Sequence, residues 1–350
     1  MKILYLASKY DYGDPSRGLS FEHENFYKTL TQFKEHQLIY FDFLDIYQKQ
    51  GRTKMNTLLW DKVREIKPDF LFCCLFQNEI DQQILKKISC ETKTITYNWF
   101  CDDHFRFDKF SKFYAPCFDY VSTTDIDAIS KYHNIGYKNV FLTQWACNTS
   151  SYKKIELPLV YDISFIGQPH GSRRQTINIL NKSGLSVLTK GFGWQQLNIL
   201  EKVAYKISKK VPSLILLGQP FLKKGNSTRI SQEEMIKIFN QSKVNLNLSN
   251  ASKISEDQIK GRNFEIPGCG GFLLTNHVKH LEKYYIPDQE IVCFNSLKEL
   301  QEKITYYLTH EKERKAIAEA GYQRTIKEHT YLKRFTEIFN KTKQSPKWHN

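Results

Sequence analysis

Long apolar runs without charge are absent from this sequence of 350 residues. None approaches the roughly 18 residues that a membrane-spanning helix needs. The first apolar segment, residues 1–6, gives way to polar residues too early for a secretory signal peptide. Glycine (16) and proline (10) are too rare for a collagen-like or disordered chain. These absences predict a folded protein of the cytoplasm.

Common ligand-binding motifs are also missing. The eight cysteines include no Cys-x-x-Cys pair and lie mostly among apolar or aromatic neighbours. This argues against a zinc site or a disulfide framework and favours reduced, buried thiols. Neither a P-loop nor a Gly-x-Gly-x-x-Gly segment occurs, so no nucleoside triphosphatase or dehydrogenase is indicated.

Positive charge is in excess, with a net of +14, and it is unevenly placed. Residues 1–155 hold 21 Lys and Arg against 19 Asp and Glu, whereas residues 156–350 hold 30 against 18. A basic second half suits a phosphate-bearing ligand, a nucleic acid or an anionic membrane surface. The alternative is a well-solvated lysine surface without a ligand.

Apolar segments of strand length alternate with helix-like segments, which is typical of parallel sheets covered by helices on both faces. The pattern restarts after a polar stretch at 150–158. We therefore predict an α/β chain with two doubly wound, Rossmann-like domains, 1–155 and 156–330, and a C-terminal helix, 331–350, packed back on the first. The segments expected to form strands are 2–7, 37–41, 68–76, 94–98, 120–124, 139–142, 161–167, 185–188, 244–248 and 272–275. The segments expected to form helices are 21–33, 57–66, 80–88, 173–183, 233–242, 262–269, 297–309 and 311–329.

Two domains of this kind that face one another would enclose a central cleft lined by the carboxyl ends of both sheets, where α/β folds bind their ligands. The functional residues are therefore expected in loops that follow strands. The first such loop runs from Gly167 to Arg173 and Arg174, at the start of a predicted helix. A glycine allows a tight turn, a helix amino end offers N–H groups to an anion, and arginine adds a fork of donors. We interpret this loop as a phosphate site, against the alternative of a helix start with exposed arginines.

A second candidate segment combines charge with a glycine-rich turn. Arg262 and Glu265 lie three residues apart, ahead of Gly270, Gly271 and a predicted strand. A carboxylate beside such a turn can accept hydrogen bonds from the vicinal hydroxyls of a ribose. The same spacing also suits a simple salt bridge along one helix face. Spacing alone leaves both interpretations open.

These segments resemble glycosyltransferases of the GT-B fold, specifically the CgeB/YkvP spore-protein-like group. The resemblance spans nearly the whole chain, and its most specific part is the Arg262-x-Phe264-Glu265 block. The other segments that carry it are 163–167 with Arg173, 191–194, 270–275, 306–308 with 313–314, Gly321, 329–331 and, in the first half, 99–103 and 119–124.

The resemblance implies that the C-terminal domain binds a nucleotide-diphosphate-sugar, a UDP- or GDP-sugar, and that the sugar is transferred with retention of configuration and without a metal or other cofactor. Glu265 matches the glutamate that holds the donor ribose in related enzymes. Asp257 occupies a position, eight residues earlier, that is acidic in related retaining enzymes. Arg173, with Arg174 as a rival, and Arg262 are the candidates for the pyrophosphate, because fixed cations stabilise a departing diphosphate.

Glycines and one tryptophan complete the expected donor site. Trp194 either stacks on the nucleotide base or belongs to the core. The glycines expected to let the donor approach are Gly167, Gly191, Gly193, Gly270 and Gly271.

The acceptor side is expected in the first domain. Asp102 and Asp103 follow an apolar strand and are candidates for the catalytic carboxylates, because paired acids can have pKa values pushed apart. The alternative is a helix-capping acid with a solvated neighbour. His104 beside them, and Glu22 and Glu24 in the first loop and helix, are further acceptor-side candidates.

The acceptor itself is not identified: a glycan, a lipid-linked glycan and a protein all remain open, as does the oligomeric state. Lysine pairs at 209–210 and 223–224 offer a peripheral contact with the inner membrane surface. Two other functions also stay open. One is a non-catalytic assembly protein of a spore or cell surface that keeps the fold, and the other is a phage-type enzyme that glycosylates DNA, although no recognition-helix motif occurs.

Overall fold

A computed structural model describes residues 1–194, 230–250 and 257–348. These residues form two compact units, 1–150 with 329–350 and 151–328. The lysine pairs at 209–210 and 223–224, on which the expected membrane contact depends, lie outside the described residues. In the described ranges, no helix combines the length and apolarity needed to cross a membrane.

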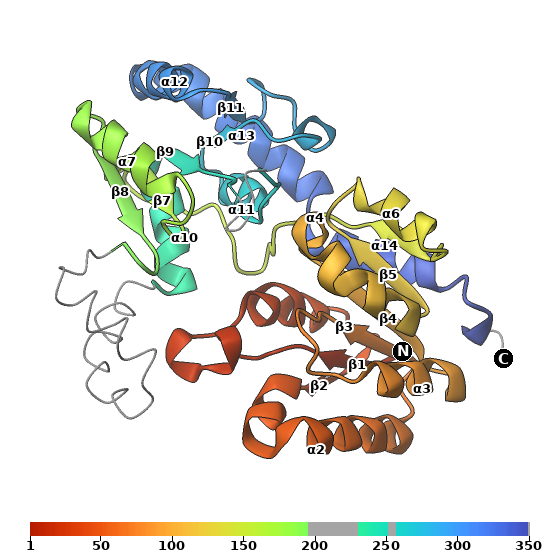
Figure 1. The fold of residues 1–350 in the computed structure, drawn as a ribbon. Helices are drawn as coiled ribbons and strands as arrows, with labels where there is room; N and C mark the ends of the chain where they lie inside the picture. The colour runs from red at the N-terminus through yellow and green to blue at the C-terminus, as the bar shows by residue number, and fades with distance from the viewer. Residues whose placement is uncertain (195–229, 251–256, 349–350) are drawn as a thin grey trace. The chain divides into compact units, whose positions relative to one another are not determined.

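The first unit is built on a parallel sheet of six strands in the order β2-β1-β3-β4-β5-β6 (Figure 1). Its strands are β1 (Lys2–Leu6), β2 (Gln37–Phe41), β3 (Phe70–Cys73), β4 (Ile95–Phe100), β5 (Tyr120–Thr123) and β6 (Val140–Leu142). Its main helices are η3 (His23–Tyr27), α1 (Lys28–Leu30), α2 (Phe43–Ile66), α3 (Gln82–Glu91), α4 (Asp103–Arg106), α6 (Ala128–Asn134) and α14 (Tyr331–Thr342). Because β2 lies on one side of β1 and β3 on the other, the topological switch of this sheet lies between β1 and β3.

Both faces of this sheet are buried, which explains why its strands are almost continuously apolar. Leu4 of β1 packs in one core with Leu59 of α2. The next residue, Tyr5, packs in a second core with Phe26 and with Phe335 of α14. Successive side chains of a strand point to opposite faces, so each strand supplies both cores.

The helix α14 returns to the first unit and belongs to its second core. Its apolar residues recur at helical spacing, and the Thr330 side chain caps its start by accepting a hydrogen bond from the backbone N–H of Lys333 at 3.3 Å. Farther along the chain, Lys347 Nζ lies 2.8 Å from Asp119 Oδ2. The C-terminal segment is therefore an integral part of this unit.

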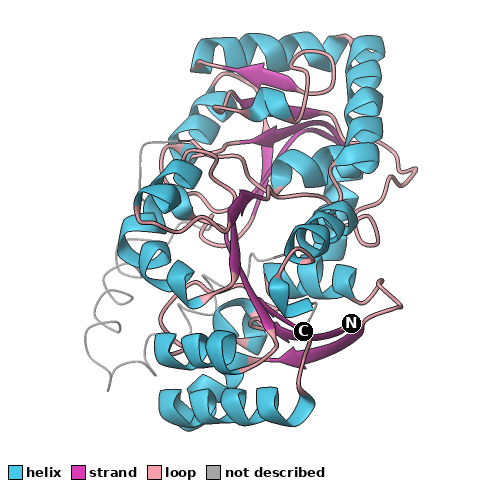
Figure 2. Cartoon of the chain, turned by 90° about the vertical axis from the view of Figure 1, so that its right-hand side faces the viewer, coloured by secondary structure: helices cyan, strands magenta, loops and turns pink. Residues whose placement is uncertain are grey.

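The second unit repeats the plan with five parallel strands in the order β11-β10-β9-β7-β8. The strands are β7 (Tyr161–Ile166), β8 (Val187–Lys190), β9 (Ser242–Asn247), β10 (Leu273–Asn276) and β11 (Val292–Phe294). The helices are α7 (Arg173–Lys182), α10 (Gln232–Gln241), α11 (Arg262–Gly268), α12 (Leu297–Thr309) and α13 (Glu311–Glu328). Helices accompany the strands of both sheets (Figure 2). Here the topological switch lies between β7 and β9.

The predicted α/β class with two parallel, doubly wound sheets is confirmed. The strand β11 was not predicted, because its apolar run is too short to stand out. The helix α2 begins at Phe43 rather than at residue 57, since its first part is largely polar and is interrupted at Gly51, whose φ is 80°. Seven of the eight cysteines are buried and unbridged, as their apolar surroundings predicted, while Cys90 is exposed.

The packing of α14 predicts that its aromatic residues stabilise the first unit. Phe335 is fully buried and its ring lies 5.6 to 6.2 Å from those of Phe72, Phe26 and Trp99. We expect Phe335→Ala to lower the free energy of unfolding by about 3–5 kcal/mol, because it leaves a cavity in a close-packed core. Urea denaturation measures this, with Phe113→Ala, at a residue that is 53% exposed, as the control. An unchanged midpoint in Phe335→Ala would contradict the role of α14.

Candidate functional site

Arg173 occupies the topological switch of the second sheet. It is the first residue of α7, and it is 6% exposed. Its Nη1 donates to the carbonyl of Gln168, after β7, at 3.2 Å. Its Nη2 donates to the carbonyls of Leu248 and Asn250, after β9, the second at 3.2 Å. The guanidinium therefore fixes the two loops between which ligands of doubly wound sheets bind.

The loops after β7 and β8 are locked together beside it. Gly191 has a φ of 135°, and a Cβ at this position would lie 2.4 Å from the carbonyl oxygen of Gly167, so only glycine fits. The Trp194 indole donates to that carbonyl oxygen at 2.6 Å. Arg174 donates to the carbonyls of Gly193 and Trp194 and lies over the Trp194 ring at 5.2 Å. In this arrangement Trp194 and Arg174 hold the loop, so the predicted stacking of Trp194 on a base stays a prediction.

The start of α11 carries the second arginine. Arg262 pairs with Glu265 through Nη1 and Oε2, and the other carboxylate oxygen of Glu265 accepts a hydrogen bond from the Tyr152 hydroxyl at 2.9 Å. The salt-bridge alternative from the sequence is therefore present. Burial alone would lower the pKa of Arg262, but the charge of Glu265 and the contact with Tyr152 raise it. Tyr152 was missed, because it lies 113 residues from Glu265 and no local pattern links the two.

A buried amide network supports α11 and was also missed. Asn247 Nδ2 donates to Thr275 Oγ1 at 3.1 Å and to Asn263 Oδ1 at 3.3 Å. Asn263 Oδ1 also accepts from the backbone N–H of Lys260 at 2.9 Å. The signal available in the sequence was the alternation of asparagines with Val244 and Leu246 in strand β9, where a buried polar group requires partners.

Asp257 joins the loop after β9 to the end of β10. It accepts hydrogen bonds from the side-chain amides of Asn250, at 3.0 Å, and of Asn276. Burial raises the pKa of Asp257, against the opposing effects of these amides and of Arg173 and Lys260. The predicted acidic residue is thus held beside Arg173.

Positive charge collects at this edge of the sheet. Burial and the charge of Arg262 lower the pKa of Arg173 to about 10, against the opposing charge of Asp257. Burial, Arg173 and Lys260 lower the pKa of His170 to about 4, so this imidazole is neutral at pH 7. Among the described residues, the Nε atoms of Arg173 and Arg262 and Nδ1 of His170 are buried without a hydrogen-bond partner. This edge therefore combines positive charge with buried arginine N–H groups that have no partner.

Gly270 and Gly271 lie at the opposite edge, which corrects their predicted contact with the donor. They follow the end of α11 and precede β10, and the ligand edge of a parallel sheet is the one at which the strands end. Their role is in packing: a Cβ on Gly270, whose φ is 71°, would lie 2.9 Å from the Lys154 side chain.

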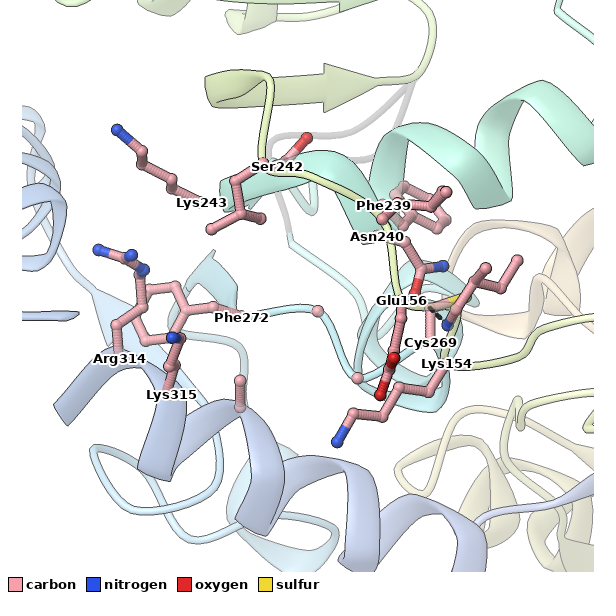
Figure 3. A pocket seen from close by; sticks show the side chains of 16 residues that line it. Lys154, Glu156, Phe239, Asn240, Ser242, Lys243, Cys269, Phe272, Arg314 and Lys315 are labelled. Atoms are coloured by element: carbon pink, nitrogen blue, oxygen red, sulfur yellow. Dashed lines mark hydrogen bonds between the residues drawn. The ribbon is translucent and has the colours of Figure 1, made fainter. Parts of the chain in front are cut away.

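A cavity of about 560 Å³ opens at this amino edge, lined by apolar side chains such as Phe239 and Phe272 and by several cations (Figure 3). The lysines that line it are paired with carboxylates. Lys154 lies 2.6 Å from Glu319, Lys243 lies 2.7 Å from Asp162 and Lys315 lies 2.5 Å from Glu311. The charges of these three lysines are thus offset by carboxylates.

In the first unit, Asp103 is buried and hydrogen-bonded within the interior. It is 1% exposed at the start of α4, and its Oδ2 accepts a hydrogen bond from the Tyr132 hydroxyl at 2.7 Å. Burial raises the pKa of Asp103, opposed by hydrogen bonds from Ser111 and Tyr132. Asp103 is thus buried away from any acceptor. The helix-capping alternative does not describe it either, because the N-cap position of α4 is Asp102, which makes no side-chain cap hydrogen bond. Asp102 and His104 are both partly exposed beside it.

Glu22 has the most perturbed carboxylate at the carboxyl edge of the first sheet. Burial, with the charges of Asp11 and Asp102 adding to it, raises the pKa of Glu22 to about 7. The backbone carbonyl of Glu22 accepts from the Tyr5 hydroxyl at 3.2 Å, which anchors the residue to β1. Glu24, by contrast, is paired with Lys28 one helical turn on. Of the two predicted glutamates, Glu22 is the one suited to proton transfer near neutral pH.

No cluster of three or more His, Cys, Asp or Glu side chains that could hold a metal ion occurs within the described ranges. The predicted independence from metals and cofactors stays a prediction.

Comparisons with known proteins agree on one fold. A family model described as glycosyl transferase-like matches residues 196–340. The spore protein CgeB of Bacillus subtilis (strain 168) is 24% identical over 247 residues, which are 67% of this chain and 71% of CgeB. Sucrose-phosphate synthase from Thermosynechococcus elongatus superimposes with a TM-score of 0.65 at 10% identity, covering 98% of both chains. HepE from Anabaena, solved with UDP and glucose, gives 0.62 at 11% identity, covering 99% of this chain and 100% of HepE. The predicted GT-B fold and the resemblance to CgeB are confirmed.

The perturbed carboxylate of Glu22 predicts a stability that depends on pH. Its pKa rises from 4.5 to about 7 on folding, so the folded state binds the proton more tightly and loses stability as the pH rises through this range. We expect Glu22→Gln to stabilise the protein by about 2 kcal/mol at pH 8 and hardly at all at about pH 4. Calorimetric unfolding across this range measures it, with Glu24→Gln as the matched control. A gain that does not change with pH would contradict the raised pKa.

Proposed function

We propose that this chain, a CgeB-like glycosyltransferase of the GT-B fold, takes its sugar from a nucleotide diphosphate held at the carboxyl edge of its second sheet. One observation carries the proposal. Arg173 and Arg262 lie close enough for one to lower the pKa of the other, and each keeps a buried Nε without a partner among the described residues. Glu265 and Asp257 offset part of this positive charge, to which Lys260 adds, and an anionic ligand would offset the rest.

The chemistry of transfer requires such a site. When the bond between the sugar and the diphosphate breaks, negative charge grows on the departing phosphate. Cations fixed before the reaction stabilise this charge without rearranging, and the loss of one such donor typically costs about 2.7–4 kcal/mol of barrier. Arg173 is fixed by three backbone carbonyls and Arg262 by Glu265, so both meet this condition.

The donor is proposed to be a uridine diphosphate sugar. HepE, which shares the fold, has been solved with UDP and with UDP-glucose. A guanosine diphosphate sugar is the alternative to test beside it. Retention of configuration and independence from metals remain part of the proposal, and the acceptor remains a glycan, a lipid-linked glycan or a protein.

Other residues receive roles from their positions. Asp257, beside Arg173, is proposed to contact the donor, as its position in the sequence implied. Glu22, whose pKa is raised to about 7 by burial and by Asp11 and Asp102, is proposed to receive the proton of the acceptor hydroxyl.

Binding of UDP, UDP-glucose and GDP by isothermal titration tests the proposal, together with release of UDP from UDP-glucose. We expect UDP to bind, and Lys260→Gln to weaken it about tenfold, because Lys260 adds its charge to that of the arginines. Lys298→Gln is the control, since the Lys298 side chain is 87% exposed and its ion pair with Glu302, at 3.8 Å, is exposed as well. Equal affinities in both variants would show that the diphosphate binds elsewhere. Failure of the unsubstituted protein to bind any nucleotide would favour the non-catalytic alternative.

A further inference from the structure

The loop that follows β1, residues 8–20, presents an exposed aromatic side chain at the carboxyl edge of the first sheet. We infer that the ring of Tyr12 in this loop stacks on a sugar ring of the acceptor, and that the acceptor is therefore a glycan. The inference rests on the proposed function for the transfer step, but binding of a glycan to Tyr12 can be measured without transfer.

Tyr12 offers its ring to solvent. Of the large apolar and aromatic side chains that the structure describes, it is the most exposed, at 71%. The Arg17 guanidinium lies over the ring, 4.7 Å from its centroid, and Arg17 Nε is held by Asp11 at 2.8 Å. Within the described ranges no other cation or aromatic ring stacks on Tyr12. Because the cation covers one face, an exposure of 71% leaves the opposite face open.

The backbone of Tyr12 is in a conformation that large side chains avoid. Its φ of 53° and ψ of 25° lie in the left-handed region. The loop holds it there, because the Asp11 N–H donates to the Gly18 carbonyl at 3.0 Å and the Gln48 side chain donates to the Tyr12 carbonyl at 3.2 Å. Glycine or asparagine would form this turn at a lower cost, so the turn by itself does not explain a tyrosine. Residues held in this way are concentrated at binding sites.

The loop lies where the acceptor is expected. It leaves β1 at the topological switch between β1 and β3, where doubly wound sheets bind their ligands. It ends beside Glu22, the proposed acceptor of the hydroxyl proton. The charge of Asp11, the residue before Tyr12, acts on the Glu22 carboxylate. An acceptor whose hydroxyl reaches Glu22 therefore has its neighbouring groups close to this loop.

The chemistry around Tyr12 suits a sugar. A pyranose has an apolar face of slightly positive C–H groups, which stacks on the negative face of an aromatic ring. Its hydroxyls need both donors and acceptors at the rim of that ring. The side chains of Asp11, Arg17 and Gln48 beside Tyr12 supply both kinds. A serine or threonine of a protein acceptor would bring a hydroxyl but no such face.

A glycan microarray read with the labelled protein tests this inference. We expect the unsubstituted protein to bind a subset of the glycans, and Tyr12→Ala to lower these signals at least about tenfold. Tyr12→Phe keeps the ring and is expected to stay within about threefold. Phe113→Ala is the matched control, because Phe113 in α5 (Lys112–Tyr114) is 53% exposed and carries the Lys112 amine over its ring at 5.2 Å. The inference is wrong if the unsubstituted protein binds no glycan, or if Tyr12→Ala binds as well as the control.

A second variant separates recognition from support of the loop. Asparagine adopts the left-handed conformation more readily than tyrosine, so Tyr12→Asn relieves the backbone while it removes the ring. We expect Tyr12→Asn to unfold at the same or a higher urea concentration than the unsubstituted protein, and to lose the glycan signals as Tyr12→Ala does. A clearly lower urea midpoint would show that Tyr12 supports the fold of the loop, and would overturn its role as a sugar platform.

Titration calorimetry with UDP-glucose distinguishes this inference from the proposed function. We expect Tyr12→Ala to bind UDP-glucose within about twofold of the unsubstituted protein, because the donor is proposed to bind the second unit. If UDP-glucose binds to neither protein while the glycan signals depend on Tyr12, the proposed function fails and the glycan site stands. If Tyr12→Ala weakens UDP-glucose about tenfold, Tyr12 contacts the donor and its assignment to the acceptor is overturned.

Discussion

Three cations, Arg173, Arg262 and Lys260, act at one edge of the second sheet against two carboxylates, Glu265 and Asp257, and this excess of positive charge is the constraint on which the rest of the site depends. Arg173 cannot move away, because three backbone carbonyls fix it at the topological switch of the second sheet. Arg262 is held in place as well, by its ion pair with the buried carboxylate of Glu265. The cost of this arrangement is visible in the lowered pKa of Arg173, which burial and Arg262 cause together. A ligand that neutralises this excess would bind and stabilise the fold by the same interaction.

The two sheets have the same doubly wound topology, but the side chains at their carboxyl edges carry charges of opposite sign. In the first unit the carboxyl edge gathers acids, and burial together with Asp11 and Asp102 raises the pKa of Glu22. In the second unit the corresponding edge gathers cations, and the pKa of Arg173 falls. Burial and like charge act in both places, and in both they favour the neutral form. One edge therefore offers a group that accepts a proton near neutral pH, and the other offers fixed positive charge.

The sequence predicted what depends on local periodicity. Apolar strands, amphipathic helices and the start of α7 at Arg173 follow from residues that are neighbours in the chain. The sequence predicted a loop at Gly191 but could not show why a glycine is required there. The atom that excludes a side chain is the carbonyl oxygen of Gly167, in another loop. The strand β11, Val292–Phe294, was not predicted, because three residues are too few to show a strand periodicity.

Tertiary contacts decided what the sequence could not. The pairing of Tyr152 with Glu265 joins residues 113 positions apart, and it engages one oxygen of the carboxylate that the resemblance assigns to the donor ribose. Asp103 was predicted to be a catalytic acid because it follows a strand, but in the structure it is buried and accepts a hydrogen bond from the Tyr132 hydroxyl. Burial of a single carboxylate is not encoded in its immediate neighbours, so both residues could be placed only in three dimensions.

The support beneath the charged edge is neutral, and this follows from electrostatics. The amides of Asn247 and Asn263 and the Thr275 hydroxyl link β9, α11 and β10 without adding a charge. A carboxylate at any of these positions would attract the arginines and compete with an incoming phosphate, whereas an apolar residue would leave the Lys260 N–H without the acceptor that Asn263 supplies. Amides satisfy the backbone and add no negative charge to that of Glu265 and Asp257, so the excess positive charge of this edge is kept for an anion such as a diphosphate.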